Sequence, residues 1–335
     1  MATLRAPSPR YRTDDPSPVV QLQADDIEIL WHVYCNRVID AKSIYMLFPN
    51  RSEQVISRRL NRLRKGPQPF LTRLPQAMNR LQLRLGSDPQ AYAIATRGAQ
   101  ALRLHRGIEL PEHRWAQKNR ELKPSTIQHD LATSKFMARL YRDASFAGGD
   151  VRVLYQQEFL PAGQGPMKSK PSGLKNTLRT AITNWHGYRG EQGTAPDRIF
   201  AFVANGKRQY FFLEMDEGTE TIVPGEARLR EPSFWRDTSL LRKFVIYASA
   251  FETKAHQLAF GIEVFRVLTV TTNPRRAETM REACRAHLKR IRPGLFLFAD
   301  WESLNAYRGS TLKFQFEDTA DRTYNFLSER QHYIM

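Results

Sequence analysis

The hydrophobic pattern of the N-terminal third predicts helices first and strands afterwards. From residue 25 onward, apolar residues recur at the three- and four-residue spacing of a helix that buries one stripe. A shorter helix is expected over residues 40–48. A third is expected over residues 53–65, after a break at Pro49-Asn50, and Asn50 or Ser52 offers its N-cap. The stripe of the first helix consists of Ile27, Leu30, Trp31 and Tyr34.

The third helix is followed by short runs that look like strands. Residues 70–74 and 92–95 are mostly apolar, and between them leucines alternate with basic or polar residues over positions 79–86. A period of two is typical of a strand with one buried and one exposed face. Three helices followed by a β-hairpin describe a winged helix-turn-helix domain. Its third helix would enter the DNA major groove, and its hairpin would contact the backbone or the minor groove.

Charge strengthens this interpretation. The 335 residues suffice for two domains, and 51 Lys and Arg against 34 Asp and Glu give a net charge of +17. Such an excess favours a polyanionic partner, because cations that contact phosphates release condensed counterions. Two alternatives are a surface charge that only keeps the protein in solution and a winged helix used for protein contacts. The residues expected to contact double-stranded DNA are Arg58, Arg59, Arg62, Arg64, Lys65, Arg80 and Arg84.

Cysteine usage and hydropathy exclude several classes of protein. Cys35 and Cys284 lie far apart, which excludes a disulfide framework and a four-cysteine zinc site and fits a reducing cytosol. Residues 1–20 lack the apolar stretch of a signal peptide, and no later run reaches the ~18 apolar residues of a membrane span. We therefore expect a cytoplasmic, nucleoid-associated protein with no membrane partner and a flexible basic arm at residues 1–20.

The remaining chain predicts a second domain over residues 125–335, joined to the winged helix (21–105) by a linker at residues 106–124. Ser125 and Gln128 form a capping box for a helix that runs to about residue 144. The order that follows is α-β-β-β-α-β-α-β, which indicates an α+β or α/β fold with a mixed sheet between two helical layers. The strands are expected at residues 151–160, 198–204, 209–215, 263–271 and 295–299, and the later helices at 234–254 and 274–291.

Cations and aromatic residues are interleaved between the first two of these strands. Aromatic rings that stack on bases, beside cations that contact phosphates, suit a loop that binds single-stranded DNA. A flexible insertion is the alternative. The residues concerned are Lys168, Lys170, Lys175, Arg179 and Arg189, with Trp185 and Tyr188.

Three acidic residues gather where two predicted strands meet. Asp197 opens the strand 198–204, and Glu214 and Asp216 close the strand 209–215. Residues two apart on a strand face the same side, and a hairpin would bring Asp197 beside them. Three carboxylates at one sheet edge repel one another unless a divalent cation compensates, so Mg²⁺ or Mn²⁺ is the expected cofactor. The alternative is a solvated hairpin end whose acids pair with Arg or Lys.

The Pro-Asp and Glu-x-Asp segments resemble the PD-(D/E)XK nuclease fold. More narrowly, the chain is similar to the replication-relaxation family, whose members pair a winged helix with a nuclease-like domain and include the C-class mobilisation relaxases of plasmids. The likeness spans roughly residues 25–255. It is carried by Arg58-Arg59-Leu60 with Leu63, Tyr92 through Gly98, His129-Asp130-Leu131, Pro196-Asp197 and Leu213 through Glu220.

The resemblance implies a DNA-binding protein of a plasmid, phage or other mobile element that recognises an origin-like site and nicks or cleaves DNA with a divalent metal. Asp197, Glu214 and Asp216 would be metal ligands and catalytic residues. The family pattern places a lysine two residues after the acid, where this chain has Asp216. A catalytic lysine would then come from the next helix, with Lys243 as the first choice and Lys254 as the second.

Two further residues and one further function remain open. His129 is a candidate general base, a group that supports a metal ligand, or a structural residue. Glu158 is a candidate metal ligand or a strand end. The alternative function is a catalytically inactive origin-binding or regulatory protein, whose nuclease-like domain contacts DNA, a second copy of the chain or partner proteins. No phosphate-binding loop, His-x-His pair or Gly-x-Ser-x-Gly elbow points to another chemistry.

Overall fold

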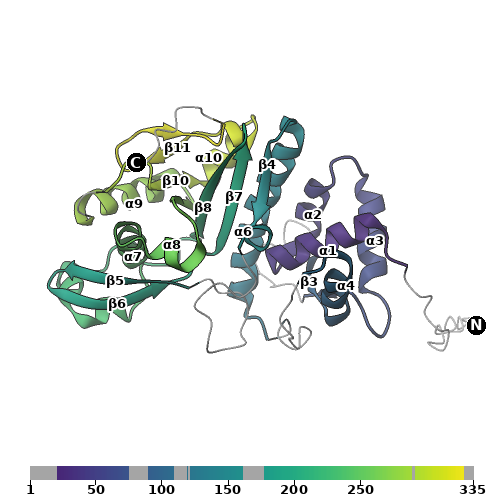
Figure 1. Ribbon diagram of the computed structural model, residues 1–335, viewed down its shortest axis with the longest axis horizontal. Coiled ribbons are helices and arrows are strands. Elements are labelled where there is room, and N and C mark those ends of the chain that lie inside the picture. The colour runs from purple at the N-terminus through teal and green to yellow at the C-terminus, as the bar shows by residue number, and fades with distance from the viewer. Residues whose placement is uncertain are drawn as a thin grey trace, which may run out of the picture.

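The computed structural model describes residues 21–74, 90–108, 119, 121–160, 177–288 and 291–327. Figure 1 shows the N-terminal elements on the right and the larger sheet on the left, with the long helix α6 (Pro124–Ala147) between them. No helix among these residues is long and apolar enough to cross a membrane. The expected arm at residues 1–20 and most of the expected linker at residues 106–124 lie outside the described residues.

The N-terminal elements have the order and pairing expected of a winged helix. Asp40 and Ser52 cap the second and third helices by accepting hydrogen bonds from the N–H groups of Ser43 and Val55. The three strands pair antiparallel in the order β1-β3-β2. Residues 75–89, which contain Arg80 and Arg84 and separate β2 from β3, lie outside the described residues. The elements are α1 (Ala24–Asn36), β1 (Ile39–Asp40), α2 (Ala41–Leu47), α3 (Glu53–Arg64), β2 (Leu71–Arg73), β3 (Ala91–Ile94) and α4 (Thr96–Arg106).

The larger sheet is mixed, and its described strands number seven, in the order β12-β11-β10-β9-β8-β7-β4. Strands β4, β7 and β8 pair antiparallel, whereas β8, β9 and β10 pair parallel. The predicted order α-β-β-β-α-β-α-β is found among α6, the sheet strands and the longer helices between them, although a separate two-stranded hairpin and shorter helices interrupt it; β11 and β12 extend the sheet beyond it. The strands are β4 (Arg152–Tyr155), β7 (Arg198–Ala204), β8 (Lys207–Met215), β9 (Phe265–Thr271), β10 (Phe296–Asp300), β11 (Phe316–Asp318) and β12 (Thr323–Tyr324).

Helices cover both faces of this sheet, so the predicted three-layer architecture is confirmed. Phe211 and Phe212 are adjacent on β8 and belong to different buried clusters, because successive side chains on a strand point to opposite faces. Phe211 shares its cluster with Phe136 of α6, and Phe212 shares its cluster with Phe244 of α7. The later helices are α7 (Leu240–Glu252), α8 (Ala255–Phe260), α9 (Pro274–His287) and α10 (Trp301–Ala306), and the 3₁₀ helices are η2 (Gln156–Glu158), η3 (Glu226–Arg230), η4 (Pro232–Trp235) and η5 (Thr311–Lys313).

Three predicted boundaries were wrong. The helix α6 begins at Pro124 with Lys123 as its N-cap, so Ser125 lies inside the first turn and forms no capping box. Strand β4 ends at Tyr155, where the chain turns into a 3₁₀ helix. The helix expected from residue 234 begins at Leu240, because the preceding residues form the short helix η4.

The segment expected to be a DNA-binding loop forms a β-hairpin instead, made of β5 (Leu178–Trp185) and β6 (Tyr188–Thr194). Trp185 stacks on Phe234 with ring centroids 5.6 Å apart, and Tyr188 packs on Trp235 at 4.6 Å. These rings pack against η4 and are not free to stack on bases. Arg179 pairs with Glu191 across the hairpin. The lysines at 168, 170 and 175 lie outside the described residues.

The two lobes share one hydrophobic cluster. It contains Trp31 of α1, Phe136 of α6 and Phe200 of β7, all of them buried. Polar contacts also cross the junction, since the hydroxyl of Tyr155 lies 3.0 Å from His32 Nδ1 and accepts a 2.8 Å hydrogen bond from Asn36 Nδ2. The N-terminal lobe is therefore docked on the sheet domain through a buried interface.

Candidate functional site

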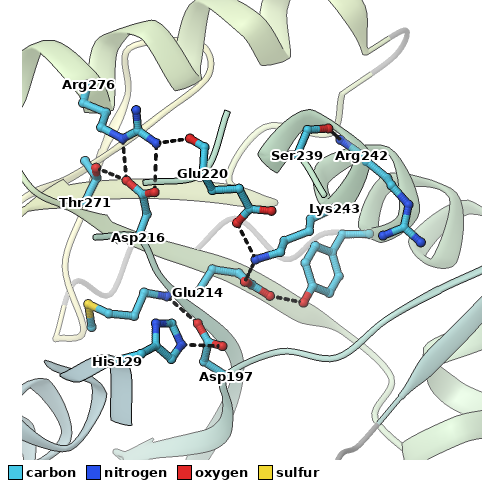
Figure 2. Close-up of polar contacts among 12 residues, drawn as sticks. His129, Asp197, Glu214, Asp216, Glu220, Ser239, Arg242, Lys243, Thr271 and Arg276 are labelled. Atoms are coloured by element: carbon cyan, nitrogen blue, oxygen red, sulfur yellow. Dashed lines mark hydrogen bonds and ion pairs between the residues drawn. The ribbon is translucent and has the colours of Figure 1, made fainter. Parts of the chain in front are cut away.

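Four of the residues singled out in the sequence meet where β7 begins and β8 ends. Asp197 directly precedes β7, and Glu214 is the penultimate residue of β8. Arg198 pairs with Leu213 in the antiparallel ladder, which brings the two acids side by side. Figure 2 shows His129 of α6 approaching Asp197 from one side and Lys243 of α7 approaching Glu214 from the other.

Asp197 is held by its own main chain and by a neighbouring strand. Its N–H donates to the carbonyl oxygen of Leu213 (3.0 Å), and its Oδ2 accepts a 2.7 Å hydrogen bond from the N–H of Met215. Its Oδ1 lies 2.8 Å from His129 Nε2. Burial disfavours the carboxylate, but the hydrogen bond and charge of His129 and the charge of Lys243 outweigh it. The pKa of Asp197 is therefore lowered.

The same contact changes the titration of His129. Burial lowers the pKa of the imidazole, but its hydrogen bond to Asp197 and the charges of Asp197, Asp130 and Glu217 outweigh burial. The net result is a raised pKa, so the imidazolium form is favoured relative to a free histidine. The contact between His129 and Asp197 is suited to orienting the Asp197 carboxylate.

Glu214 is the most enclosed of the site's carboxylates, with 1 % of its surface exposed. Burial raises its pKa to about 7, against the opposing influence of Lys243 and with the support of the nearby Asp197 charge. Its Oε2 lies 3.1 Å from Lys243 Nζ, and its Oε1 accepts a hydrogen bond from the hydroxyl of Tyr247.

Lys243 lies between two carboxylates. Its Nζ is 3.1 Å from Glu214 and 3.0 Å from Oε2 of Glu220, and 23 % of its side chain is exposed. Burial opposes its positive charge, but Glu214, Asp197 and Glu220 outweigh burial and raise its pKa, so the ammonium is retained. Lys254, the second choice from sequence, is exposed at the C-terminal side of α7 and has no ion pair among the described residues.

Asp216 does not join this group. Its carboxylate forms a two-pronged ion pair with Arg276, with Oδ2 to Nε at 2.6 Å and Oδ1 to Nη2 at 2.9 Å, and also accepts from Thr271. Figure 2 shows this pair at the upper left, apart from Asp197 and His129 at the bottom. The period-two argument did not foresee this pair, because Arg276 comes from α9 and takes both carboxylate oxygens of Asp216.

A metal centre at this place would therefore use two carboxylates. Among the residues the structure describes, no group of three or more His, Cys, Asp or Glu is arranged to hold a metal ion. Asp197 and Glu214 nevertheless supply the oxygen donors that Mg²⁺ and Mn²⁺ prefer, and such ions are commonly bound by one or two carboxylates with water and phosphate. Burial is the main cause of the raised pKa of Glu214, and the nearby charge of Asp197 adds to it. These residues fit a divalent cation.

Glu158 is not part of the site. It lies in η2, where its carboxylate accepts a 2.7 Å hydrogen bond from the N–H of Tyr155 and a longer one from Tyr141. The candidate ligand is thus a turn-capping residue at the end of β4.

The basic residues of α3 divide into two groups. Arg59 and Arg62 pair with Asp26 of α1, whose side chain is fully buried, so these two arginines hold the helices together. That these two arginines also contact DNA stays a prediction. Arg58 and Lys65 are exposed and make no ion pair within the described ranges, and Arg64 is half-buried with a hydrogen bond to Asn61. The outward cationic surface of α3 is therefore smaller than its sequence suggests.

Three site residues were missed as participants: Glu220, Tyr247 and Arg276. Glu220 belongs to the acidic segment 213–220 that drew attention, and its spacing from Lys243 gave no hint of their contact. Tyr247 lies one turn after Lys243 on α7, where helical periodicity places both on one face. Arg276, in the first turn of α9, carried no signal that linked it to Asp216.

A comparison with family models decides the relationship of the chain. The replication-relaxation model matches residues 30–261, well over half of the sequence. The chain belongs to the replication-relaxation family. A search of curated proteins and a search of solved structures each found no significant match. Membership of the replication-relaxation family indicates a role in the replication or relaxation of mobile-element DNA. The matched range ends before β9, so Arg276 lies outside it.

Proposed function

We propose that this protein is a metal-dependent DNA-nicking protein of a mobile element, in which the winged helix recognises an origin-like duplex and the β7–β8 site cleaves one strand. The observation that carries the proposal is the site's composition. Two carboxylates, Asp197 and Glu214, lie side by side at adjacent strand ends, with the ammonium of Lys243 3.1 Å from one of them. This combination matches the acid, acid and lysine of the PD-(D/E)XK pattern.

Asp197 and Glu214 would hold Mg²⁺ or Mn²⁺. When bound, such an ion supplies a water of lowered pKa and neutralises charge on the phosphate. Lys243 keeps its proton and presents a fixed positive charge beside Glu214, in a position to stabilise negative charge that develops on the phosphate. Lys243 on α7 would take the role of the lysine that the family pattern has at position 216, where this chain has Asp216.

His129 orients Asp197. Its Nε2 contacts Oδ1 while the N–H of Met215 occupies Oδ2, so the carboxylate is fixed from both sides. We assign His129 this supporting role because its ring contacts the Asp197 carboxylate directly.

Nicking of supercoiled plasmid tests the proposal. Plasmid that carries the element's origin, incubated with Mn²⁺, should turn into open circles. Asp197→Asn and Lys243→Met should each slow this reaction by about 100-fold or more. Lys254→Met is the matched control, since that lysine lies just after α7 and outside the site, and it should nick like the wild type. Equal nicking by wild type and Asp197→Asn would refute the proposal.

A second readout addresses the metal alone. Mn²⁺ should raise the melting temperature of the wild type, because a ligand that binds only the folded state stabilises it. Asp197→Asn should abolish that increase. A Mn²⁺-dependent increase of the same size in both proteins would show that the ion binds elsewhere.

One observation favours an inactive, DNA-binding protein as the second candidate. Each oxygen of Asp197 and Glu214 already has a protein partner: His129, the Met215 N–H, Tyr247 and Lys243. The site is thus largely neutralised by the chain itself. If the protein is an inactive DNA-binding protein, origin binding would survive the double change Asp197→Ala with Glu214→Ala and would need no divalent ion.

A further inference from the structure

Arg198 connects the main chain beside Asp197 to the winged helix. Its Nη1 donates a 2.7 Å hydrogen bond to the carbonyl oxygen of Asp197, and its Nη2 donates to the carbonyl oxygen of Asn36. Asn36 is the last residue of α1, so the guanidinium binds a helix C-terminus, where the helix dipole favours a cation. One side chain therefore joins the first element of the winged helix to the residue before β7.

Asp130 is a buried acid of α6 that lies close to the Arg198 guanidinium. Its side chain is 6 % exposed, and its Oδ1 lies 3.8 Å from Arg198 Nη2 while its Oδ2 lies 3.4 Å from Arg37 Nη1. Within the described residues Oδ2 has no hydrogen bond, so the buried carboxylate depends on these two cations. Arg37 is the C-cap residue of α1 and adopts φ of 63°, which is uncommon for residues other than glycine. Its guanidinium pairs with Asp130.

We infer that Arg198 and Asp130 form a clamp that positions the Asp197 carboxylate relative to the winged helix. The inference rests on the proposed nicking function and adds two positioning residues to it. The neighbouring strand holds the N–H of Asp197 through Leu213, and Arg198 holds its carbonyl oxygen. The clamp fixes that main chain on the same α1 that carries the Asp26 contacts to α3. DNA held by the winged helix then meets the carboxylate at one defined place.

This arrangement predicts a loss of turnover without a loss of DNA binding. A misplacement of about 1 Å at a reacting centre can cost about 100-fold in rate. Arg198→Lys keeps the charge, but a lysine lacks the planar fork that spans two carbonyl oxygens. Asp130→Asn keeps the shape of the side chain and removes the negative charge that compensates the guanidinium of Arg198. Each variant should lower kcat for nicking by about 10- to 100-fold, with KM for origin DNA within about twofold of wild type.

Asp143→Asn is the matched control. Asp143 is a second buried acid on α6 that pairs with an arginine, Arg142, and its Oδ2 accepts a 2.6 Å hydrogen bond from the N–H of Thr311. It lies 13 residues beyond Asp130, about 20 Å along the helix. The Asp143→Asn variant should lose folding stability as Asp130→Asn does, while retaining wild-type kcat. The double variant Asp130→Asn with Arg198→Lys should turn over no more slowly than Arg198→Lys, because the two residues act as one unit.

A readout without DNA or metal separates this inference from the proposed function. The amide of Met215 donates to Asp197 Oδ2, so its hydrogen exchange reports whether that carboxylate is in place. Relative to the amide of Phe211, in the middle of the β7–β8 ladder, Met215 should exchange on the order of tenfold faster in Arg198→Lys and Asp130→Asn. In Asp143→Asn the ratio should stay at the wild-type value.

The outcomes are distinct. Unchanged Met215 exchange in both clamp variants, or equal loss of kcat in Asp143→Asn and Asp130→Asn, overturns the clamp. A wild type that does not nick under any divalent condition overturns the proposed function, and the exchange measurement still decides whether Arg198 and Asp130 hold Asp197.

Discussion

At the scale of single residues, the environment of Glu214 has a consequence for stability. The carboxyl group is enclosed by α7 and lies beside Asp197, and burial raises its pKa from 4.5 to about 7. Lys243 and the hydroxyl of Tyr247 stabilise the ionised form and limit this increase. Between these two pKa values the folded protein binds a proton that the unfolded chain has lost.

We therefore expect Glu214 to make folding stability fall as pH rises from about 4.5 to about 7, with no further change from this group above that range. Below pH 4.5 both states are protonated and the group contributes nothing. The full effect is on the order of 3 kcal/mol. Glu214→Gln should remove this part of the slope and should be the more stable protein at pH 8. Urea unfolding of both proteins across the pH range measures it.

Other groups that titrate in this range are common to both proteins. The raised pKa of His129 stabilises the fold below its unfolded value of 6.5, and this contribution is lost as pH rises through the folded value. Its effect cancels in the difference between wild type and Glu214→Gln to the extent that the two sites are independent. Parallel stability profiles for the two proteins would contradict the prediction.

At the scale of elements, α3 has two cationic sets with different partners. Arg59 and Arg62 face α1 and bind the buried Asp26, whereas Arg58 and Lys65 face outward. Helical geometry makes this division possible, because residues three and four apart lie on one face. A count of arginines along the helix cannot distinguish the sets, since the buried acid that separates them comes from another helix.

This division predicts opposite effects for arginines that are neighbours in the sequence. Arg58→Ala should weaken origin binding by about 1–3 kcal/mol if the side chain contacts a base, with folding stability unchanged. Arg59→Ala should instead lower the free energy of unfolding by about 1–3 kcal/mol, because Asp26 loses one of its charged hydrogen-bond donors.

Fluorescence anisotropy with labelled origin DNA and urea unfolding measure the two quantities. Affinity that is unchanged in both Arg58→Ala and Lys65→Ala would remove α3 from the DNA interface. Binding should also weaken steeply with salt, because each phosphate contact releases a counterion.

At the scale of the whole molecule, the winged helix and the sheet domain share a buried cluster and a polar junction. Tyr155 of β4 is 1 % exposed and contacts both His32 and Asn36 of α1. Separating the lobes would expose this tyrosine, Trp31 and the partners of Arg198. The energetic coupling between the lobes is therefore expected to be strong.

Because of this shared cluster, the full chain should unfold in one cooperative transition. Far-UV circular dichroism and tryptophan fluorescence should give the same urea midpoint, and the calorimetric and van't Hoff enthalpies should agree. Two separate transitions, with one lobe unfolding first, would show that the junction contributes little.

Much of the architecture follows from the sequence alone, because it depends on local periodicity. The strand-like runs over 198–204 and 209–215 and the helical stripe that begins near residue 25 predicted β7, β8 and α1 to within a few residues. The Pro-Asp and Glu-x-Asp spacing, together with the family resemblance, placed Asp197 and Glu214 side by side. These features depend on the period of the apolar side chains and on the order of the strands, and both can be read directly from the sequence.

The tertiary structure decided what each charge is paired with. Asp216 pairs with Arg276 of α9, Lys243 pairs with Glu214 and Glu220, and Asp26 pairs with two arginines of α3. It also turned the aromatic residues of the β5–β6 hairpin inward onto η4. The partners in these contacts are between 23 and 60 residues apart, and burial sets the energy of each contact. No local pattern records that information.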